Sequence, residues 1–429
     1  MSMVIEKDLT TEDLYSLSPK ALWQQFKSEG FSFWMICGYL FIEYVRPQSI
    51  VPALNFLPWG QIFLLFALAS WGFSSPKWVA SSANKWMVAF LIVITMSCIA
   101  AIYPEYSWKH YKDFYSWFII YFAIINIVNT PRRLFIFLIL FLLCSFKISQ
   151  FTARVWAARG FSFTGWGLQG PPGFFENSGE LAIQMLVFFP LSLGVAVFLK
   201  KYIGKIKYYF LLTFPLTAVA TILGASSRGA QLALIYQLYR VFLKGKLSVG
   251  RIAAVLCIGV AVFFAIPQEQ KDRFSSAGED KTSQQRLLYW KHGVEIIQEN
   301  PVLGAGLFNF IPYYETHFRN DMLYPFAELP HNIFIQVGTD AGLLGLSIFL
   351  MLIYQQFAIL RYVRKNADQY KWGAYYTAMS EGLGAGLWGF LVAGQFVTVT
   401  YYPFFWIGLA FSVALKNTME KDSRIDVKS

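Results

Sequence analysis

The chain has 429 residues, of which 56% are hydrophobic and only 14% are charged. A soluble globular domain carries about 25% charged residues, so this composition excludes an ordinary soluble protein. The formal net charge of +11 could be a signal for nucleic acid binding, but the placement of the charges argues for a different origin.

Apolar runs of about 20 residues recur along the whole chain, which is typical of a polytopic membrane protein. We predict an all-α fold with about twelve transmembrane helices, which follow a polar lead at residues 1–30 and precede a polar tail at 416–429. The predicted spans are 31–45, 57–73, 86–103, 114–129, 134–151, 179–199, 206–224, 229–243, 251–267, 332–360, 373–398 and 401–415.

These spans form three groups, at residues 31–151, 179–267 and 331–415, and two polar stretches, 152–178 and 268–330, separate them. With both termini in the cytoplasm, 23 of the 36 Lys and Arg residues fall in short cytoplasmic segments. The positive-inside rule therefore predicts cytoplasmic termini and two external stretches. The basic excess is a topology signal, and we expect no nucleic acid partner.

The first span ends with Glu43, three residues before Arg46. Residues at this spacing lie on one helical face, so pairing would offset most of the cost of a carboxylate in the membrane. We expect a structural ion pair and leave a functional role of Glu43 open.

The stretch 152–178 places Arg154 and Arg159 among aromatic residues and contains Asn177 near its end. These three residues are candidates for substrate binding. Contact with lipid head groups would explain the two arginines equally well, and Ser178 is expected to cap the next helix.

Arg228 lies between two apolar segments with no loop to accommodate it. An arginine at membrane depth costs about 2.5–3.5 kcal/mol on insertion scales. The small neighbours Ser226, Ser227 and Gly229 leave space and backbone N–H groups beside the guanidinium. This favours an anion site over a side chain that only reaches the lipid head groups.

The stretch 268–330 is long enough to fold and carry function. A helix is predicted at Gln284–Gln298, ending at Asn300-Pro301 and followed by a turn at Gly304 and Gly306. Its predicted apolar stripe consists of Leu287, Leu288, Trp290, Val294 and Ile297.

Arg286 lies on this helix, and His331 lies where the chain re-enters the membrane, next to Asn332. Two guanidinium groups can clamp phosphate oxygens. An imidazole with a pKa near 6.5 can accept a proton at neutral pH, and Asn332 adds an amide for substrate binding. Taken alone, Arg286 would be a solvated charge and His331 a helix cap, so the hypothesis requires that Arg228, Arg286 and His331 meet in space.

No DxD, HExxH, CxxC or Walker-type motif occurs, and Asp280 with its neighbour Glu279 has no partner cluster in the sequence. The cysteines lie singly inside predicted spans, at positions 37, 98, 144 and 257. We therefore expect no metal and no cofactor. The glycines of the span 373–398 are interpreted as helix-packing positions, and these are Gly382, Gly384, Gly386, Gly389 and Gly394.

Several motifs occur in a recognisable order. They are GPPGFFENSGELA at 170–182, SSRGA at 226–230, SQQRLLYW at 283–290, NPVLGAG at 300–306 and HNIFIQVGTDAGLLG at 331–345. Together they resemble the O-antigen ligase and polymerase superfamily of bacteria. The resemblance implies a GT-C-like fold in the bacterial inner membrane, with the large loop 268–330 in the periplasm.

The resemblance also implies a metal-independent, inverting glycosyl transfer. A glycan on undecaprenyl diphosphate would move to a hydroxyl of lipid A core, or to another repeat unit if the protein is a polymerase. Arg228 and Arg286 would hold the diphosphate and His331 would activate the acceptor, whereas Asp340 stands where relatives often have glutamate and receives no role. A flippase for the same lipid-linked glycan is a further alternative, although no internal repeat supports it.

The predicted topology is testable with two single cysteines, Gly278→Cys and Ser429→Cys, in a background without the four native cysteines. Because residue 278 lies in the external loop and residue 429 in the cytoplasmic tail, only Gly278→Cys should react with an impermeant maleimide in intact cells. Labelling of Ser429→Cys alone would contradict the topology.

Overall fold

The computed structural model describes residues 10–74, 77–162, 167–240 and 278–424, and within these ranges it contains helices and no strand. The helices are α1 (Thr11–Tyr15), α2 (Pro19–Ser28), α3 (Phe31–Val45), α4 (Pro47–Ile50), α5 (Trp59–Phe73), α6 (Ser82–Ile99), α7 (Pro104–Ile127), α8 (Pro131–Ala158), α9 (Ser178–Leu199), α10 (Lys205–Gly224), α11 (Arg228–Leu238), α14 (Lys281–Glu299), α15 (Phe310–His317), α16 (Ile333–Asn366), α17 (Gly373–Ala393) and α18 (Pro403–Glu420). The predicted all-α fold is confirmed for this part of the chain.

Five of the described helices are long and apolar enough to cross a membrane, namely α6, α8, α9, α10 and α16, the last with its short continuation to Gln369. The helices α3 and α5 are apolar but shorter. The chain is therefore a multi-pass membrane protein. Every predicted span coincides with a helix except 251–267, which lies outside the described residues, and the total number of spans stays a prediction.

Two helix boundaries differ from the predicted spans more than the others do. The helix α7 begins at Pro104 instead of residue 114, and α8 continues to Ala158 instead of ending at 151. Proline at the first helical position suits the start of both α7 and α8. Hydropathy indicates where a helix meets lipid, whereas a helix ends where its backbone hydrogen bonding ends. The stretch 152–178, which is predicted to be external, is consequently helical over its first residues.

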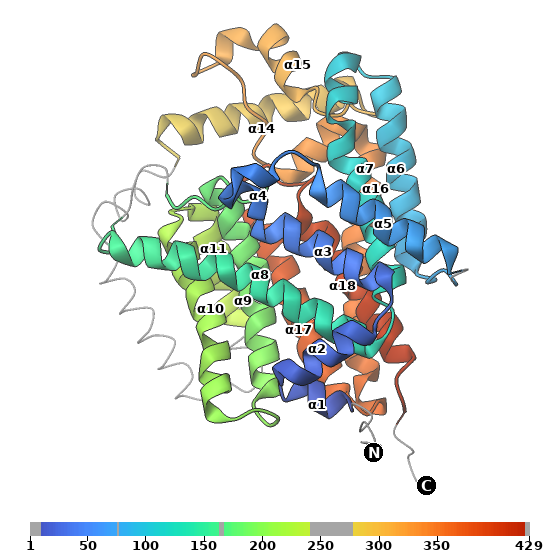
Figure 1. The fold of residues 1–429 in the computed structure, drawn as a ribbon. Helices are drawn as coiled ribbons and strands as arrows, with labels where there is room; N and C mark the ends of the chain where they lie inside the picture. The colour runs from blue at the N-terminus through green and yellow to red at the C-terminus, as the bar shows by residue number, and fades with distance from the viewer. Residues whose placement is uncertain (1–9, 75–76, 163–166, 241–277, 425–429) are drawn as a thin grey trace, which may run out of the picture.

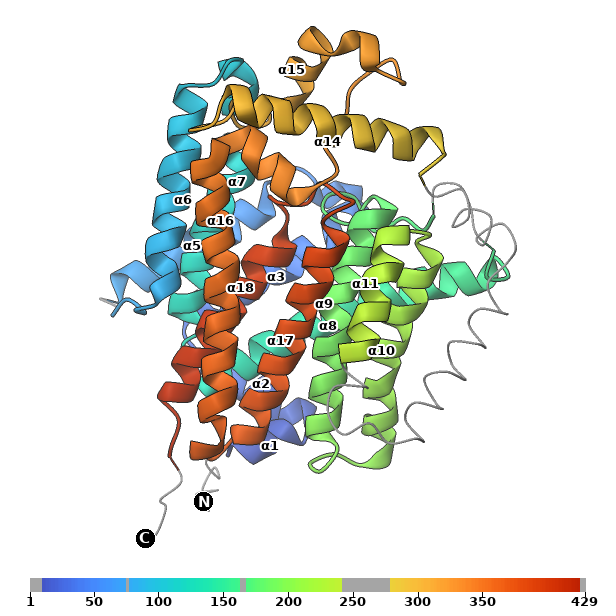
Figure 2. The ribbon, with the colours of Figure 1, turned by 180° about the vertical axis from the view of Figure 1, so that it is seen from behind.

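The membrane helices form a bundle, and α14 and α15 cover one end of it, while α1 and α2 lie near the opposite end (Figures 1 and 2). The helix α9 is the most enclosed of the long apolar helices, with 83% of its apolar window buried. Side chains from α8, α10 and α17 surround it, so it forms the core against which the other helices pack.

The glycines of α17 permit close contact with α9, as predicted. A Cβ on Gly382 would lie 2.8 Å from the Cα of Leu191, and one on Gly386 would lie 3.3 Å from the Cα of Val187. The prediction is wrong for Gly384, whose added Cβ would find only ordinary contact, 3.8 Å from Leu360.

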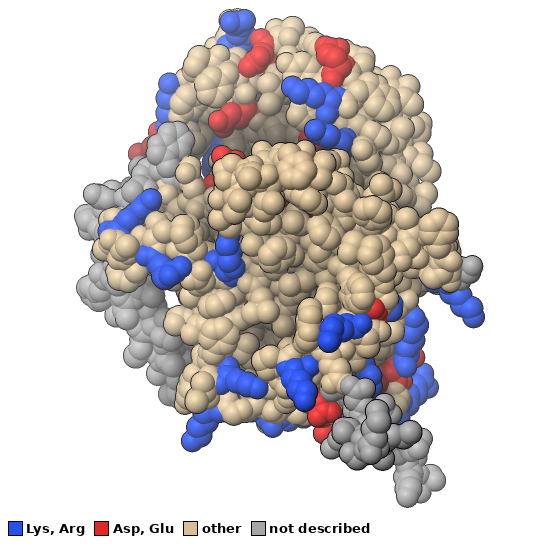
Figure 3. All heavy atoms as spheres, viewed as in Figure 1, with Lys and Arg blue, Asp and Glu red and all other residues tan. Residues whose placement is uncertain are grey.

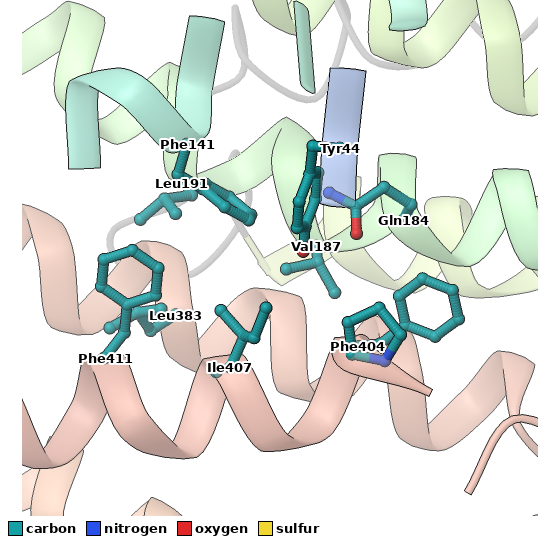
Figure 4. Close-up of a pocket in the computed structure, with 11 residues that line it drawn as sticks. Tyr44, Phe141, Gln184, Val187, Leu191, Leu383, Phe404, Ile407 and Phe411 are labelled. Atoms are coloured by element: carbon teal, nitrogen blue, oxygen red, sulfur yellow. The ribbon is translucent and has the colours of Figure 1, made fainter. Parts of the chain in front are cut away.

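The predicted ion pair at the end of the first span is confirmed, with Arg46 Nη2 3.5 Å from Glu43 Oε2. The three described cysteines, Cys37, Cys98 and Cys144, are buried in helices as predicted, and Cys257 lies outside the described residues. Figure 4 shows a small gap between α3, α8, α9, α17 and α18, lined by Tyr44, Gln184 and apolar side chains. None of the described residues around this gap is charged, so it is a packing feature of the core.

The helix α16 is broken at Gly342, where φ is 64° and ψ is −167°. Such a break leaves backbone groups without partners inside the helix, and these must be paired elsewhere within a membrane. The segment after α14 supplies the partners. Ala305 N donates to Thr339 O at 2.8 Å, and Leu343 N donates to Pro301 O at 2.7 Å.

Glycines make this junction possible. A Cβ on Gly304 would lie 2.4 Å from Thr339 O, and a Cβ on Gly342 would lie 2.4 Å from the carbonyl carbon of Val302. Gly304 and Gly306 both have positive φ, which confirms the predicted turn. The motif at 300–306 therefore supplies hydrogen-bond partners for the backbone groups at the break in α16.

Asp340, to which the sequence assigned no role, also stabilises this junction. Its side chain is fully buried and accepts hydrogen bonds from Phe308 N and from Tyr401 Oη, each at 2.9 Å. The carboxylate thereby fixes the segment after α14 to both α16 and the start of α18.

We predict that Gly342→Ala lowers the apparent melting temperature in detergent. A side chain at this left-handed position costs about 1–3 kcal/mol, and its Cβ would collide with the backbone at Val302. The matched control is Gly384→Ala in α17, which has space for a methyl group and should melt at or above the parental temperature. Equal melting temperatures for the two variants would contradict the proposed docking.

Candidate functional site

The helix α14 lies across the end of the bundle, over the start of α16 (Figures 1 and 2). It begins at Asp280, whose side chain caps it by accepting from Ser283 N at 3.0 Å. Contact with α16 is close, since a Cβ on Gly293 would lie 2.4 Å from a side-chain carbon of Ile335. The helix is therefore held rigidly above the membrane helices.

The predicted helix in the large loop is confirmed, but its predicted apolar stripe is wrong in part. Leu287 and Val294 of that stripe are 50% and 47% exposed. The buried face instead consists of Gln285, Tyr289, His292, Gly293 and Ile296. Segments far along the sequence cover this face and pair its polar groups, as when Leu323 N donates to Gln285 Oε1 at 2.7 Å.

Arg228 is the first residue of α11, directly after the capping residue Ser227. Its Nη2 donates to Asp280 Oδ2 at 3.0 Å and to Ser283 Oγ at 3.2 Å. Burial alone would raise the pKa of Asp280, but hydrogen bonds from Ser283 and the charge of Arg228 lower it to about 2. The sequence shows no cluster of metal-ligating residues around Asp280, and in the structure this carboxylate pairs with Arg228 of α11.

Arg286 also lies on α14, closer to the middle of the helix than Asp280. Burial lowers its pKa, and the charge of Arg228 lowers it further, while Glu328 and Asp280 oppose the shift. Its Nε is buried and makes no hydrogen bond with the described residues. Arg286 thus interacts electrostatically with Arg228 on one side and with Glu328 on the other.

His331 follows a short turn that α14 holds in place. Glu328 N donates to Tyr289 Oη at 2.9 Å, and Trp290 Nε1 donates to Pro330 O at 2.9 Å. His331 itself has a φ of 51°.

The side chain of His331 interacts with two charged groups. Its Nε2 lies 2.9 Å from Glu328 Oε2. Burial lowers the pKa of His331, and Arg286 lowers it further, whereas Glu328 acts in the opposite direction. The imidazole is therefore neutral at pH 7. A hydrogen bond from His331 lowers the pKa of Glu328, so the carboxylate is ionised at the same pH.

The remaining candidate residues have structural contacts. Asn332 caps α16, with Oδ1 accepting from Phe334 N at 2.9 Å. Asn177, and not Ser178 as expected, is the cap of α9. Arg154 and Arg159 are exposed at the end of α8. Arg154 Nε donates to Gln150 O, and Arg159 ends the helix, so among the described residues both contact their own helix and not Arg228, Arg286 or His331. Their roles in substrate binding stay predictions.

The structure thus brings together Arg228, Arg286 and His331, which come from three separate segments. It adds Asp280 and Glu328, which sequence analysis missed as site residues. Glu328 could have been found, because it precedes His331 by three residues. Asp280 could not, because its partner is separated from it by 52 positions.

A space-filling view shows a hollow on one face of the molecule, below the lobe formed by α14 and α15, with acidic and basic side chains along its edge (Figure 3). Within the described ranges, no group of three or more His, Cys, Asp or Glu residues is arranged to hold a metal ion. The arrangement combines guanidinium groups that can bind an anion with a neutral imidazole that can accept a proton.

Comparison with known families matches the part of the chain that contains these residues. Residues 213–350 match the family model described as O-Antigen ligase. This range contains Arg228, Arg286 and His331, and it excludes Arg154, Arg159 and Asn177. The resemblance to the O-antigen ligase superfamily is therefore confirmed over this range, in a chain whose described helices are those of a multi-pass membrane protein.

Individual relatives agree with the family match. A protein of Rickettsia prowazekii (strain Madrid E) is 28% identical over 144 residues, which is 32% of this chain and 35% of the relative. One from Rickettsia bellii (strain RML369-C) is 24% identical over 172 residues, or 38% of this chain and 41% of the relative. Both carry the name "Putative polysaccharide ligase". The chain thus spans well under half the length of these curated relatives.

Proposed function

We propose that this protein transfers a glycan from undecaprenyl diphosphate to an acceptor hydroxyl at the periplasmic face of the bacterial inner membrane. The observation that carries the proposal is the convergence of Arg228, Arg286 and His331 below α14. The lipid A core is the proposed acceptor, because the family description and the names of the relatives refer to ligases. Both termini would then be cytoplasmic, as the basic residues predict.

The two arginines suit the leaving group. When the bond between the sugar and the phosphate breaks, negative charge develops on the departing diphosphate, and preorganised guanidinium groups stabilise it strongly where water is excluded. Arg286 is suited to this role, because its buried Nε lacks a hydrogen-bond partner among the described residues. A diphosphate would share Arg228 with Asp280 or displace this carboxylate from it.

His331 suits the acceptor. In an inverting displacement the acceptor oxygen bonds to the anomeric carbon as the bond to the diphosphate breaks, and the hydroxyl proton passes to a base. Because burial and Arg286 lower its pKa, His331 is in the neutral form that can accept this proton at pH 7. The donor leaves as undecaprenyl diphosphate, and the reaction needs no nucleotide.

A repeat-unit polymerase would use the same chemistry with another glycan as acceptor. A flippase would instead move the donor across the membrane without forming a glycosidic bond. Product analysis with purified protein, lipid-linked glycan and lipid A core distinguishes the three, since only the ligase joins donor and core.

We predict that Arg228→Lys and Arg286→Lys each lower transfer about 100-fold. Lysine keeps the charge but loses the bidentate fork, and loss of one preorganised donor costs about 10²–10³ in turnover. Transfer is measured with purified protein at matched expression. Arg319→Lys, at an exposed position of the same loop, is the control and should retain parental activity.

The same assay tests metal independence. A chelator should leave parental transfer unchanged, and added divalent metal should not restore the two lysine variants. Loss of parental activity in the presence of chelator would indicate that a metal ion, and not the pair of arginines, binds the diphosphate.

We predict that His331→Ala still binds the donor but transfers its glycan at least about 100-fold more slowly, because removal of a general base costs about 10²–10⁴ in rate. His331→Gln can hydrogen-bond but cannot take the proton, and it should be nearly as slow. His317→Gln, an exposed histidine of the same loop, is the control. Parental turnover by His331→Gln would reduce His331 to a binding residue.

A further inference from the structure

The contact between Glu328 and His331 determines which nitrogen of the imidazole can act as the base. Because the Glu328 carboxylate is ionised, it can only accept a hydrogen bond. The proton of the neutral imidazole therefore lies on Nε2, which is 2.9 Å from Glu328 Oε2. The lone pair is left on Nδ1, which makes no hydrogen bond with the described residues.

We propose that Glu328 is a positioning residue that holds His331 with Nε2 protonated, so that Nδ1 takes the proton of the acceptor hydroxyl. This inference rests on the proposed function, because it assigns a role within the same reaction. Glu328 would act through His331 and would not itself touch the sugar.

The backbone around the pair supports a fixed geometry. Glu328 N is held by Tyr289 Oη and Pro330 O by Trp290 Nε1, so two consecutive residues of α14 anchor the turn. On the other side, His331 N donates to Thr398 Oγ1 at 2.8 Å, in the segment between α17 and α18. The backbones of Glu328 and His331 are thus placed by the scaffold, which keeps the two side chains within reach of each other.

The surrounding charges explain why a carboxylate is needed at this position. The charged groups that act on His331 are Arg286 from α14 and Glu328 from the turn, and Thr398 on the third side is neutral. Arg228 lies beyond Arg286 and is paired with Asp280. When His331 takes a proton, its imidazolium would face Arg286 alone if Glu328 were absent. Glu328 offsets this repulsion and stabilises the protonated imidazole.

The test compares Glu328→Gln and Glu328→Ala with the parent in the transfer assay, as a function of pH. Glutamine keeps an acceptor oxygen but loses the charge, so His331 should become a weaker base. Turnover at neutral pH should fall about 10–100-fold, in the lower part of the range for a general base. The acidic limb of the pH profile should move to lower pH, because removal of the carboxylate lowers the pKa of His331. Glu328→Ala should be at least as slow.

The matched control is Glu315→Gln. Glu315 accepts a hydrogen bond from Ala327 N at 2.9 Å and so supports the same segment without touching His331. Its variant should keep both the parental rate and the parental acidic limb. Binding of undecaprenyl diphosphate by Glu328→Gln should also be parental, which shows that the variant is folded.

A double variant tests whether the effect of Glu328 on turnover passes through His331. If Glu328 acts through His331, Glu328→Gln should slow the parent but cause little further loss in His331→Gln, since groups that act as a unit are non-additive. An equal loss in both backgrounds would overturn the inference, as would a Glu328→Gln protein with parental rate and pH profile. The proposed function would survive either result, because it is tested separately, by whether the parental protein joins the donor glycan to lipid A core.

Discussion

The structure depends on the backbone hydrogen bonds that close the break in α16. A membrane helix cannot leave a carbonyl and an N–H unpaired in lipid, and here the segment directly after α14 pairs with Thr339 O and Leu343 N. This pairing ties the end of α14 to the middle of a membrane helix. The other end of α14 is tied to α11 by Arg228 and Asp280. With both ends held, α14 can present Arg286, Tyr289 and Trp290 at fixed positions above the bundle.

Two basic and two acidic side chains interact around α14 in the described structure. Arg228 pairs with Asp280, and the turn before α16 brings Glu328 within electrostatic range of Arg286. Charges removed from water need partners, and the buried Nε of Arg286 lacks one among the described residues. In the proposed reaction the donor diphosphate would supply this partner. The carboxylate of Asp280 would then compete with the diphosphate for Arg228.

The family match and the scaffold cover different parts of the chain. The matched range, 213–350, includes the two arginines, the histidine and the segment that closes the break in α16. Thr398, which holds the backbone of His331, and Tyr401, which holds Asp340, lie outside it. The candidate site residues thus belong to the matched range, while the connection between α17 and α18 contributes to their placement.

The sequence by itself determined the helical elements, because hydropathy and helix caps are local properties. It also pointed to Arg228, because an arginine is costly at membrane depth and stands out between apolar segments. Arg286 and His331 were indicated by their residue types in the long polar stretch and by the family resemblance. It did not determine the buried face of α14, since segments distant in sequence cover that helix. The pairing of Arg228 with Asp280 and the role of Asp340 were equally inaccessible. Such contacts depend on where separate segments meet in space, and only the tertiary structure decided that.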